Sequence, residues 1–194
     1  QKVLNIARTE LTGFTIENFS KNETPSLLSF NSKKRPEKFK VILNAHLDVV
    51  PAKDEDYQAV EKGGKLFGRG SIDMKAPAAV EILVFKELAS QLNYPLGLQL
   101  VTDEETGGFN GTRYQIEQRV RADFVIAGEH TNFGINNKAK GIIWIKITAS
   151  GKTGHAAYPW LGQNPIVELN SFLTKLLKEF PLPKKESWQT TINL

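Results

Sequence analysis

The chain has 194 residues, of which 40% are hydrophobic and 24% are charged, and its formal net charge is +4. This composition is typical of a globular protein with one large domain or two small ones. No run approaches the roughly 18 apolar residues that a membrane span needs. The absence of cysteine excludes disulfides, thiolate zinc sites and cysteine nucleophiles, so any bound metal must be held by histidine, aspartate or glutamate. Because the chain begins with Gln1 rather than methionine, the lack of a leader pattern says little about targeting.

The first predicted elements are strands at residues 26–30 and 39–45, separated by a basic cluster. This cluster consists of Lys33, Lys34, Arg35, Lys38 and Lys40. A nucleic-acid surface is expected to combine its charge with aromatic or glycine-rich neighbours. The run of charge by itself therefore favours a solvated hairpin tip, and we expect no nucleic-acid partner.

The middle of the chain predicts alternating helices and strands. A helix is expected from Lys75 to Leu92, with Pro77 in its first turn. Its apolar residues recur at helical spacing and form one stripe: Ala76, Ala79, Val80, Leu83, Val84, Leu88 and Leu92. A strand, a helix capped by Asn110 and a further buried strand follow, at residues 96–101, 110–120 and 123–127. This order indicates an α/β sheet covered by helices.

The pattern of apolar and polar residues changes after residue 139. Residues 141–149 alternate between apolar and polar side chains, which predicts a half-buried strand. Asn164 begins a strongly amphipathic helix, and a further strand is expected from about Trp188. We therefore expect a larger domain at residues 1–138 and the first half of a smaller α/β domain at residues 139–194.

Polar side chains follow three of the predicted strands directly. His46 and Asp48 follow the first of these strands, Asp103, Glu104 and Glu105 the second, and Glu129 the third. In open α/β sheets, ligands bind at the carboxyl ends of the strands. These residues are therefore placed where a site is expected.

His46 is one of three histidines, with His130 and His155. A lone histidine is more often structural than functional. Here Asp48 follows two residues later, and a carboxylate is what a metal-ligating imidazole needs to fix its tautomer and orientation. His46 is thus a candidate metal ligand.

Two further motifs supply carboxylates. A glycine-rich turn, Gly68–Lys75 (GRGSIDMK), presents Asp73 at the start of the long helix. A phosphate cradle is the alternative interpretation, but neither the Walker pattern nor the dinucleotide fingerprint is present. The second motif is Thr102–Gly108 (TDEETGG), whose adjacent carboxylates are costly to bury unless a cation or a shared proton compensates them.

The two glutamates of this second motif can divide the work of a metal site. One can bind the metal while its neighbour takes a proton from water. An isolated pair of this kind is more often an exposed acidic turn. The complete set offers imidazole and carboxylate ligands without sulfur, which suits zinc, with cobalt or manganese as substitutes.

Together these motifs resemble a known family. The resemblance is carried by His46–Pro51 (HLDVVP), Gly68–Lys75, Glu104–Glu105, Gly128–Glu129 and Gly154–Pro159 (GHAAYP). In this order, over about residues 41–170, they are similar to the zinc-dependent hydrolases that include acetylornithine deacetylase, succinyl-diaminopimelate desuccinylase, aminoacylase and a zinc carboxypeptidase. The resemblance implies a three-layer α/β/α catalytic domain with a central sheet, and the first part of a smaller α/β lid and dimerisation domain.

The resemblance also implies a role for each candidate residue. The metal ligands would be His46, Asp73, Glu105 and Glu129, with Asp73 bridging two zinc ions. The catalytic residues would be Glu104 as general base, Asp48 as the partner that holds His46, and His155, which polarises the substrate carbonyl, often from the partner subunit of a dimer. His155 and Asn164 would contact the substrate, and the peptide bond after Asp73 is expected to be cis.

The implied activity is hydrolysis of the amide bond of an N-acyl amino acid by metal-activated water. A di- or tripeptidase or a carboxypeptidase of the same family is the alternative, and so is a metal-binding or dimerisation module without catalysis. Glu104 argues against the module, because a structural site needs no general base. The expected partners are a small N-acyl amino acid or short peptide and, for the full-length protein, a second copy of itself, with no membrane, and the expected location is cytoplasmic.

The sequence departs from the family pattern at a few places. His130 stands where the family commonly has proline, and Ala76 stands where glycine is usual. The family's second zinc takes a further histidine from a C-terminal segment, and no residue after His155 supplies it. We therefore expect this chain to bind one zinc better than two and to hydrolyse its substrate poorly by itself.

Overall fold

The computed structural model describes residues 2–194. The chain forms two compact units, Gln1–Ile135 and Asn136–Leu194. Every buried hydrophobic residue of the described chain lies in the first unit. Among the described residues, no helix is both long enough and apolar enough to cross a membrane.

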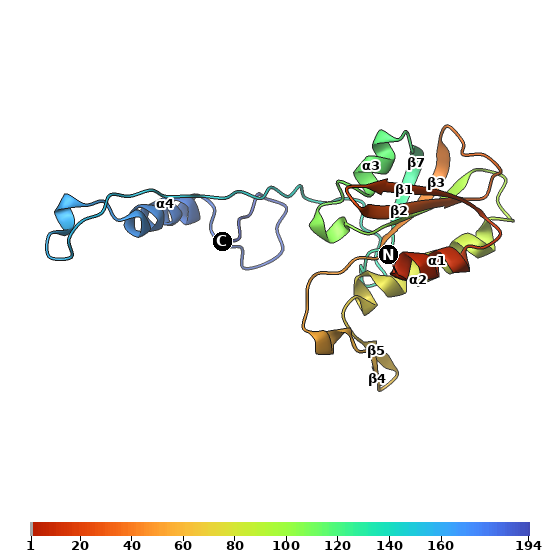
Figure 1. Ribbon diagram of the computed structural model, residues 1–194, viewed down its shortest axis with the longest axis horizontal. Helices are drawn as coiled ribbons and strands as arrows, with labels where there is room; N and C mark the ends of the chain where they lie inside the picture. Colours follow the sequence, from red (N-terminus) through yellow and green to blue (C-terminus); the bar gives the residue numbers. More distant parts are fainter. Residues whose placement is uncertain (1) are drawn as a thin grey trace. The chain divides into compact units, whose positions relative to one another are not determined.

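The first unit is built around a mixed sheet with the strand order β1-β2-β6-β3-β7 (Figure 1). Its strands are β1 Thr15–Lys21, β2 Thr24–Phe30, β3 Phe39–His46, β6 Leu96–Val101 and β7 Ala122–Ala127. β3 runs parallel to both β6 and β7, whereas β1, β2 and β6 pair antiparallel. The carboxyl ends of β3, β6 and β7 therefore lie at one edge of the sheet. A separate hairpin, β4 Val60–Lys62 and β5 Lys65–Phe67, lies between β3 and α2 in sequence.

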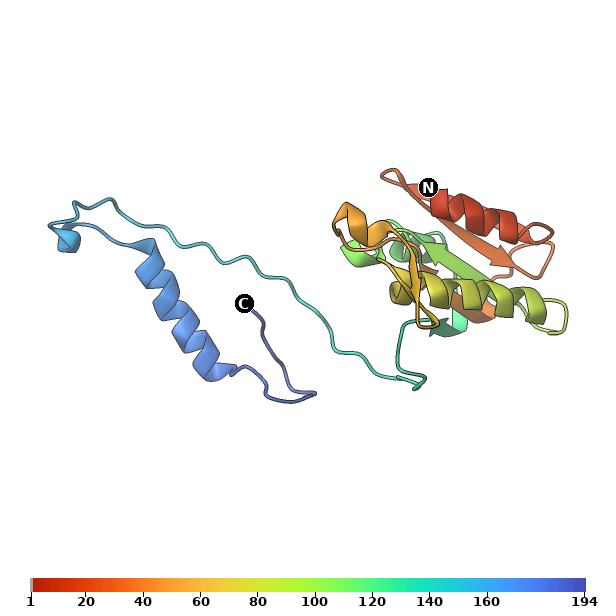
Figure 2. The same cartoon turned by 90° about the horizontal axis from the view of Figure 1, so that it is seen from below.

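Helices cover both faces of the sheet, so the predicted α/β/α layering is confirmed. Helices α1 (Lys2–Glu10) and α2 (Ala76–Leu88) lie side by side on one face, and α3 (Thr112–Glu117) covers the other (Figures 1 and 2). The larger core cluster packs α1 and α2 onto the sheet through residues that include Leu4, Leu43, Phe85 and Leu98. A smaller cluster on the α3 side includes Leu28, Phe39, Ile42 and Val120.

The basic cluster does not form a hairpin tip. Strands β2 and β3 flank it in the sequence, but β6 lies between them in the sheet. Its lysines are exposed, and Arg35 pairs with Glu17 of β1 at 2.8 Å. The prediction of solvated charge is confirmed, whereas the hairpin is wrong, because each strand takes a partner that local sequence does not reveal.

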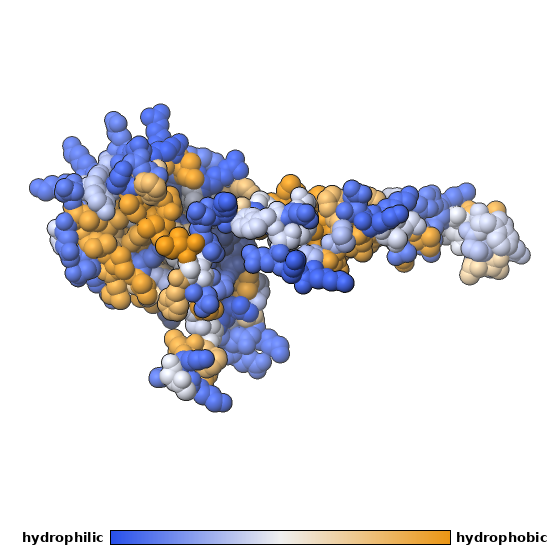
Figure 3. All heavy atoms as spheres, turned by 180° about the vertical axis from the view of Figure 1, so that it is seen from behind, coloured by the Kyte–Doolittle hydropathy of each residue, from blue (hydrophilic) through white to orange (hydrophobic). Residues whose placement is uncertain are grey.

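Helix α2 buries a different face from the one that the sequence predicts. Its buried residues are Ala78, Glu81, Ile82 and Phe85. Val80 and Leu83 of the predicted stripe are instead 57% and 62% exposed. Because apolar residues surround most of this helix, their spacing does not decide which side faces the sheet. The exposed side chains of α2 add to the apolar surface of the first unit. This surface contains an orange area in Figure 3.

A chain of buried side-chain amides crosses the α3 side of the sheet. Asn44 of β3 donates to Gln99 of β6 at 2.8 Å. Gln99 donates to Gln115 of α3 at 2.9 Å, and Gln115 donates in turn to Ser26 of β2 at 2.9 Å. Buried polar groups need such partners. These bonds fasten α3 to three of the strands.

The second unit contains α4 (Pro165–Glu179), a short 3-10 turn at Pro159–Leu161 and a bridge between Lys152 and Gln163. Asn164 caps α4 as predicted, its Oδ1 accepting from the amide of Ile166 at 2.9 Å. The strands predicted at 141–149 and from Trp188 are wrong. A strand needs a hydrogen-bonded neighbour, and the described residues of this unit supply only the one bridge.

Candidate metal centre

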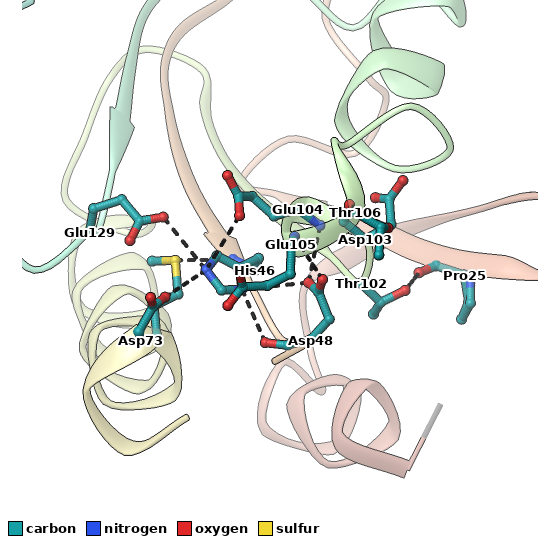
Figure 4. A network of polar contacts seen from close by, with 11 residues as sticks. Pro25, His46, Asp48, Asp73, Thr102, Asp103, Glu104, Glu105, Thr106 and Glu129 are labelled. Carbon is teal, nitrogen blue, oxygen red and sulfur yellow. Dashed lines mark hydrogen bonds and ion pairs between the residues drawn. The ribbon is translucent and has the colours of Figure 1, made fainter. Parts of the chain in front are cut away.

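Three strand ends and one turn bring the polar cluster together. His46 ends β3, Glu104 and Glu105 follow β6, and Glu129 follows β7. Asp73 comes from the turn before α2. Figure 4 shows these carboxylates arranged around the His46 ring. The parallel order of β6, β3 and β7 places them at one edge, although they lie far apart in the sequence.

His46 lies at the centre of the cluster and is only 2% exposed. Its Nδ1 lies 3.1 Å from the backbone oxygen of Asp48 and 3.5 Å from Oδ1 of the Asp48 carboxylate. Both oxygens can only accept, so Nδ1 carries the proton of this bond. The other ring nitrogen, Nε2, is left to face the remaining side chains.

Three carboxylates surround Nε2 of His46. Asp73 Oδ1 lies 3.0 Å away, Glu129 Oε1 lies 3.6 Å away and Glu104 Oε2 lies 3.9 Å away. Glu105 joins the group, because ligand atoms of His46, Asp73 and Glu105 all lie within 4.8 Å of one another. A neutral ring would point its lone pair at these carboxylates. The arrangement therefore needs either a protonated ring or a bound cation.

The burial and close approach of these charged groups shift the pKa values of His46, Glu104 and Glu129. Burial lowers the pKa of His46, but the hydrogen bonds and charge of Asp48, with the charge of Glu129, outweigh it and raise that pKa to about 9. Burial raises the pKa of Glu104, which His46 opposes and the neighbouring carboxylates reinforce. Burial likewise raises the pKa of Glu129, with His46 opposing and Asp73 adding to the shift. A cation bound here would have to displace protons.

A tight turn at Ser71–Lys75 presents Asp73 and leads into α2. Gly70 precedes it with a φ of 81°, and a Cβ there would collide with a neighbouring valine, so the turn requires glycine. The Asp73–Met74 peptide bond is cis, as expected. Met74 is buried, and its sulfur accepts the backbone N–H of His46 at 3.3 Å. The turn and β3 are therefore joined directly at the cluster.

Asp48 forms hydrogen bonds with both His46 and the acidic loop after β6, Asp103–Gly108. Its carboxylate accepts the backbone amides of Glu104 at 3.2 Å and Glu105 at 3.0 Å, while its backbone oxygen holds His46. One residue thereby fixes the ring and the start of the loop together. The sequence motif indicated the link to His46 but not the link to the loop.

Asp103, placed at the strand end by the sequence but given no role there, is a structural member of the loop. Its Oδ2 accepts the amides of Asn110 at 2.7 Å and Gly111 at 3.1 Å, which closes the loop onto the start of α3. The available signal was an aspartate shortly before the Gly107–Gly108 pair, since aspartates near turns commonly bond to nearby backbone amides.

His155 and Asn164, expected to contact substrate, belong to the second unit. Nδ1 of His155 accepts the amide of Ala157 at 3.1 Å, so a neutral ring presents Nε2–H as a donor. Oδ1 of Asn164 is used in capping α4, which leaves its amide nitrogen for a ligand. Close packing holds the loop between them: a Cβ on Gly154 would lie 2.9 Å from Cα of Gly162.

The donor set of the first unit fits a divalent metal. Imidazole nitrogen and carboxylate oxygen are ligands that zinc takes, and several carboxylates around one buried nitrogen favour a cation between them. Among residues 2–194, Asp73, Glu104 and Glu129 form ion pairs only with His46. Lys75 lies near Asp48 and Asp73 without forming an ion pair with either of them, but the carboxylates around His46 still outnumber these two cationic side chains, so the cluster is short of positive charge.

Comparison with known proteins identifies the family. The sequence pattern described as Peptidase family M20/M25/M40 matches residues 42–183. The chain belongs to this family. The match spans β3 to the end of α4 and includes every residue of the cluster, and it confirms the family resemblance drawn from the motifs.

Curated relatives of this M20 chain carry related names. A protein named probable carboxypeptidase from Paracoccidioides brasiliensis (strain Pb03) is 33% identical, over 80% of this chain and 39% of its own length. The succinyl-diaminopimelate desuccinylase of Buchnera aphidicola subsp. Cinara cedri is 33% identical, over 91% of this chain and 50% of its own length. The M20 chain thus spans half or less of the length of these relatives.

Solved structures share the fold of the M20 chain. The M20 family metallo-carboxypeptidase Sso-CP2 from Sulfolobus solfataricus has a TM-score of 0.63 at 19% identity, covering 89% of this chain and 44% of its own. The aminopeptidase PepT from Bacillus cereus ATCC 10987 has a TM-score of 0.57 at 16% identity, covering 96% and 52%. At these identities the likeness concerns the fold alone.

Proposed function

We propose that this M20 chain forms the metal-binding part of an amide hydrolase. The observation that supports this most directly is the crowding at Nε2 of His46, where carboxylates surround a nitrogen that has no other partner within residues 2–194. His46, Asp73, Glu105 and Glu129 would hold the metal, because together they supply one imidazole nitrogen and three carboxylates. Bound zinc would supply Lewis acidity, lowering the pKa of water and polarising a carbonyl.

Glu104 is the proposed general base. Its carboxylate reaches the cluster at 3.9 Å from His46 Nε2, farther out than those of Asp73 and Glu129. Its raised pKa suits a group that accepts a proton from water and passes it to the leaving amine. Asp48 would keep His46 and the Glu104 backbone in register during these transfers.

His155 is the proposed donor to the substrate carbonyl oxygen. Its Nε2–H is left free by the bond that Nδ1 accepts, and such a donor stabilises negative charge as water attacks the carbonyl. The amide nitrogen of Asn164 would donate to a polar group of the same substrate. His155 lies on the loop held by the Gly154–Gly162 contact, and Asn164 follows that loop as the N-cap of α4.

We infer an N-acyl amino acid as the substrate class. A relative named succinyl-diaminopimelate desuccinylase supports this inference, while relatives named probable carboxypeptidase support a peptide substrate instead. A panel of acetyl-amino acids, succinyl-diaminopimelate and short peptides, tested on the longest natural form of the protein, separates the two. Hydrolysis of peptides alone would reject the N-acyl assignment.

The adjacent pair Glu104 and Glu105 tests the division of roles. Glu104→Gln should keep the metal content of the wild type but lose most of its turnover, because it removes the proton acceptor. Glu105→Gln should lower both, because it removes a ligand. Equal loss of metal in the two variants would reject Glu104 as a base. Equal, measurable turnover of Glu104→Gln and wild type would also reject Glu104 as the base, whereas no hydrolysis by the metal-loaded wild type would favour a non-catalytic module.

A further inference from the structure

Glu81 is a buried carboxyl outside the proposed ligand set. It lies on the face of α2 that packs against the sheet and is 7% exposed. Both of its carboxyl oxygens are buried without a hydrogen-bond partner among residues 2–194. Leaving a buried polar group unpaired is costly, and an apolar side chain would fill a helix–sheet contact without that cost. The position therefore needs an explanation other than core packing.

The carboxyl of Glu81 lies against Gly128, which connects the end of β7 to Glu129. A Cβ added to Gly128 would lie 2.8 Å from Oε1 and 3.0 Å from Cδ of Glu81. The missing side chain of Gly128 therefore leaves the space that the carboxyl fills. Gly128 is also tied to β3, because its amide donates to the backbone oxygen of Asn44 at 3.1 Å.

Met74 closes the same space from the turn before α2. The added Cβ on Gly128 would lie 3.2 Å from Cε of Met74. Met74 is 1% exposed, follows Asp73 directly, and accepts the backbone N–H of His46 through its sulfur. The space beside Gly128 that Glu81 and Met74 border thus adjoins three of the proposed ligands, His46, Asp73 and Glu129.

Glu81 enters this contact as a largely uncharged group at neutral pH. Burial raises its pKa to about 8, which the backbone of Asn44 opposes and the charge of Glu129 reinforces. Glutamine has nearly the same shape as the protonated acid. A Glu81→Gln variant therefore preserves the packing, whereas Glu81→Ala removes it.

We propose that Glu81 is a positioning residue for the metal centre, filling the space beside Gly128 and so fixing where Glu129 leaves the sheet. The inference rests on the proposed metal centre and adds a residue that itself touches neither metal nor substrate. Its effect reaches the site through Gly128 on one side and Met74 on the other.

Co²⁺ binding to the whole chain tests this proposal, because the absorption spectrum of the bound ion reports ligand geometry as well as occupancy. We expect Glu81→Ala to weaken binding about tenfold or more and to change the spectrum, and Glu81→Gln to retain both. Glu87→Ala, on the exposed side of the same helix, is the matched control and should bind like the wild type. Thermal unfolding in EDTA identifies which variants are folded.

The glycine partner gives an independent arm of the test. Gly128→Ala should weaken Co²⁺ binding because its methyl group collides with the Glu81 carboxyl. Combining it with Glu81→Ala frees that space, so the double variant should bind more tightly than Gly128→Ala alone. This comparison does not depend on the folding of Glu81→Ala by itself.

The outcomes separate this inference from the proposed function. Wild-type affinity and spectrum in folded Glu81→Ala, or in Gly128→Ala, would overturn the positioning role and leave the metal centre standing. The absence of Co²⁺ binding by the folded wild type would overturn the metal centre, and the positioning role with it.

Discussion

Asp48 shows how a single side chain can join two parts of a site. Burial would raise its pKa, but the hydrogen bond to His46 and the backbone amides of Glu105 and Glu104 lower that pKa overall. The folded state therefore favours the charged carboxylate although the side chain is only 17% exposed. A charged Asp48 both orients the His46 ring and fixes the acidic loop.

Replacing Asp48 by asparagine should weaken metal binding. The neutral amide supports the His46 ring less strongly and offers one acceptor in place of two to the loop amides. We expect metal affinity to fall about 10- to 100-fold while the fold is retained, measured by calorimetry. Asp123→Asn, which removes an exposed carboxylate paired with lysines, is the control. Unchanged affinity in Asp48→Asn would reject the linking role.

Glu81 should make the stability of the metal-free protein depend on pH. Its pKa is about 8 in the folded state against an ordinary value of 4.5, so the folded state holds the proton more tightly than the unfolded state. The resulting stabilisation is complete below about pH 4.5 and is lost as the pH rises toward 8. Glu81→Gln lacks this titration.

Urea unfolding in EDTA at several pH values checks this sign. The free energy of unfolding of the wild type should fall relative to Glu81→Gln between pH 5 and 8, by up to about 1.4 kcal/mol per pH unit. Other shifted groups, including His46, are present in both proteins and cancel in the comparison. Parallel curves for the two proteins would contradict the raised pKa of Glu81.

At the scale of elements, the local sequence pattern predicted which segments of the sheet are strands better than it predicted which strands pair with one another. The polar residues after β3, β6 and β7 could be identified because short apolar runs precede each of them. The insertion of β6 between β2 and β3 could not, since it depends on pairing between distant segments. The burial of Glu81 on α2 was missed for a related reason: the space that its carboxyl fills lies beside Gly128, which comes 47 residues later.

The amide chain across the sheet offers a test of how α3 is held. Gln115→Leu should destabilise the protein by roughly 1–3 kcal/mol, because Gln99 and Ser26 would lose buried partners. Gln118→Leu, at an exposed position just beyond α3, should change stability little. Chemical denaturation compares the two, and equal effects would show that the amide chain contributes nothing specific.

Over the whole molecule, the two units differ in how much surface they bury. The second unit has no buried residue and exposes Ile143, Trp144 and Ile145 almost completely. Exposed apolar surface of this kind favours association. The homodimer expected of the full-length protein remains a prediction, and sedimentation velocity of its longest natural form tests it: a single monomeric species at micromolar concentration would contradict it.

The central claim, that the ends of β3, β6 and β7 and the turn before α2 build a metal centre, is tested most directly by the zinc content of the purified chain. Wild type should be compared with His46→Ala and Asp73→Ala, using Asp123→Ala as the control. We predict one or more zinc ions per chain in the wild type and the control, and loss of zinc in both site variants. Folded wild type without zinc after exposure to it, or site variants that retain it, would contradict the metal centre.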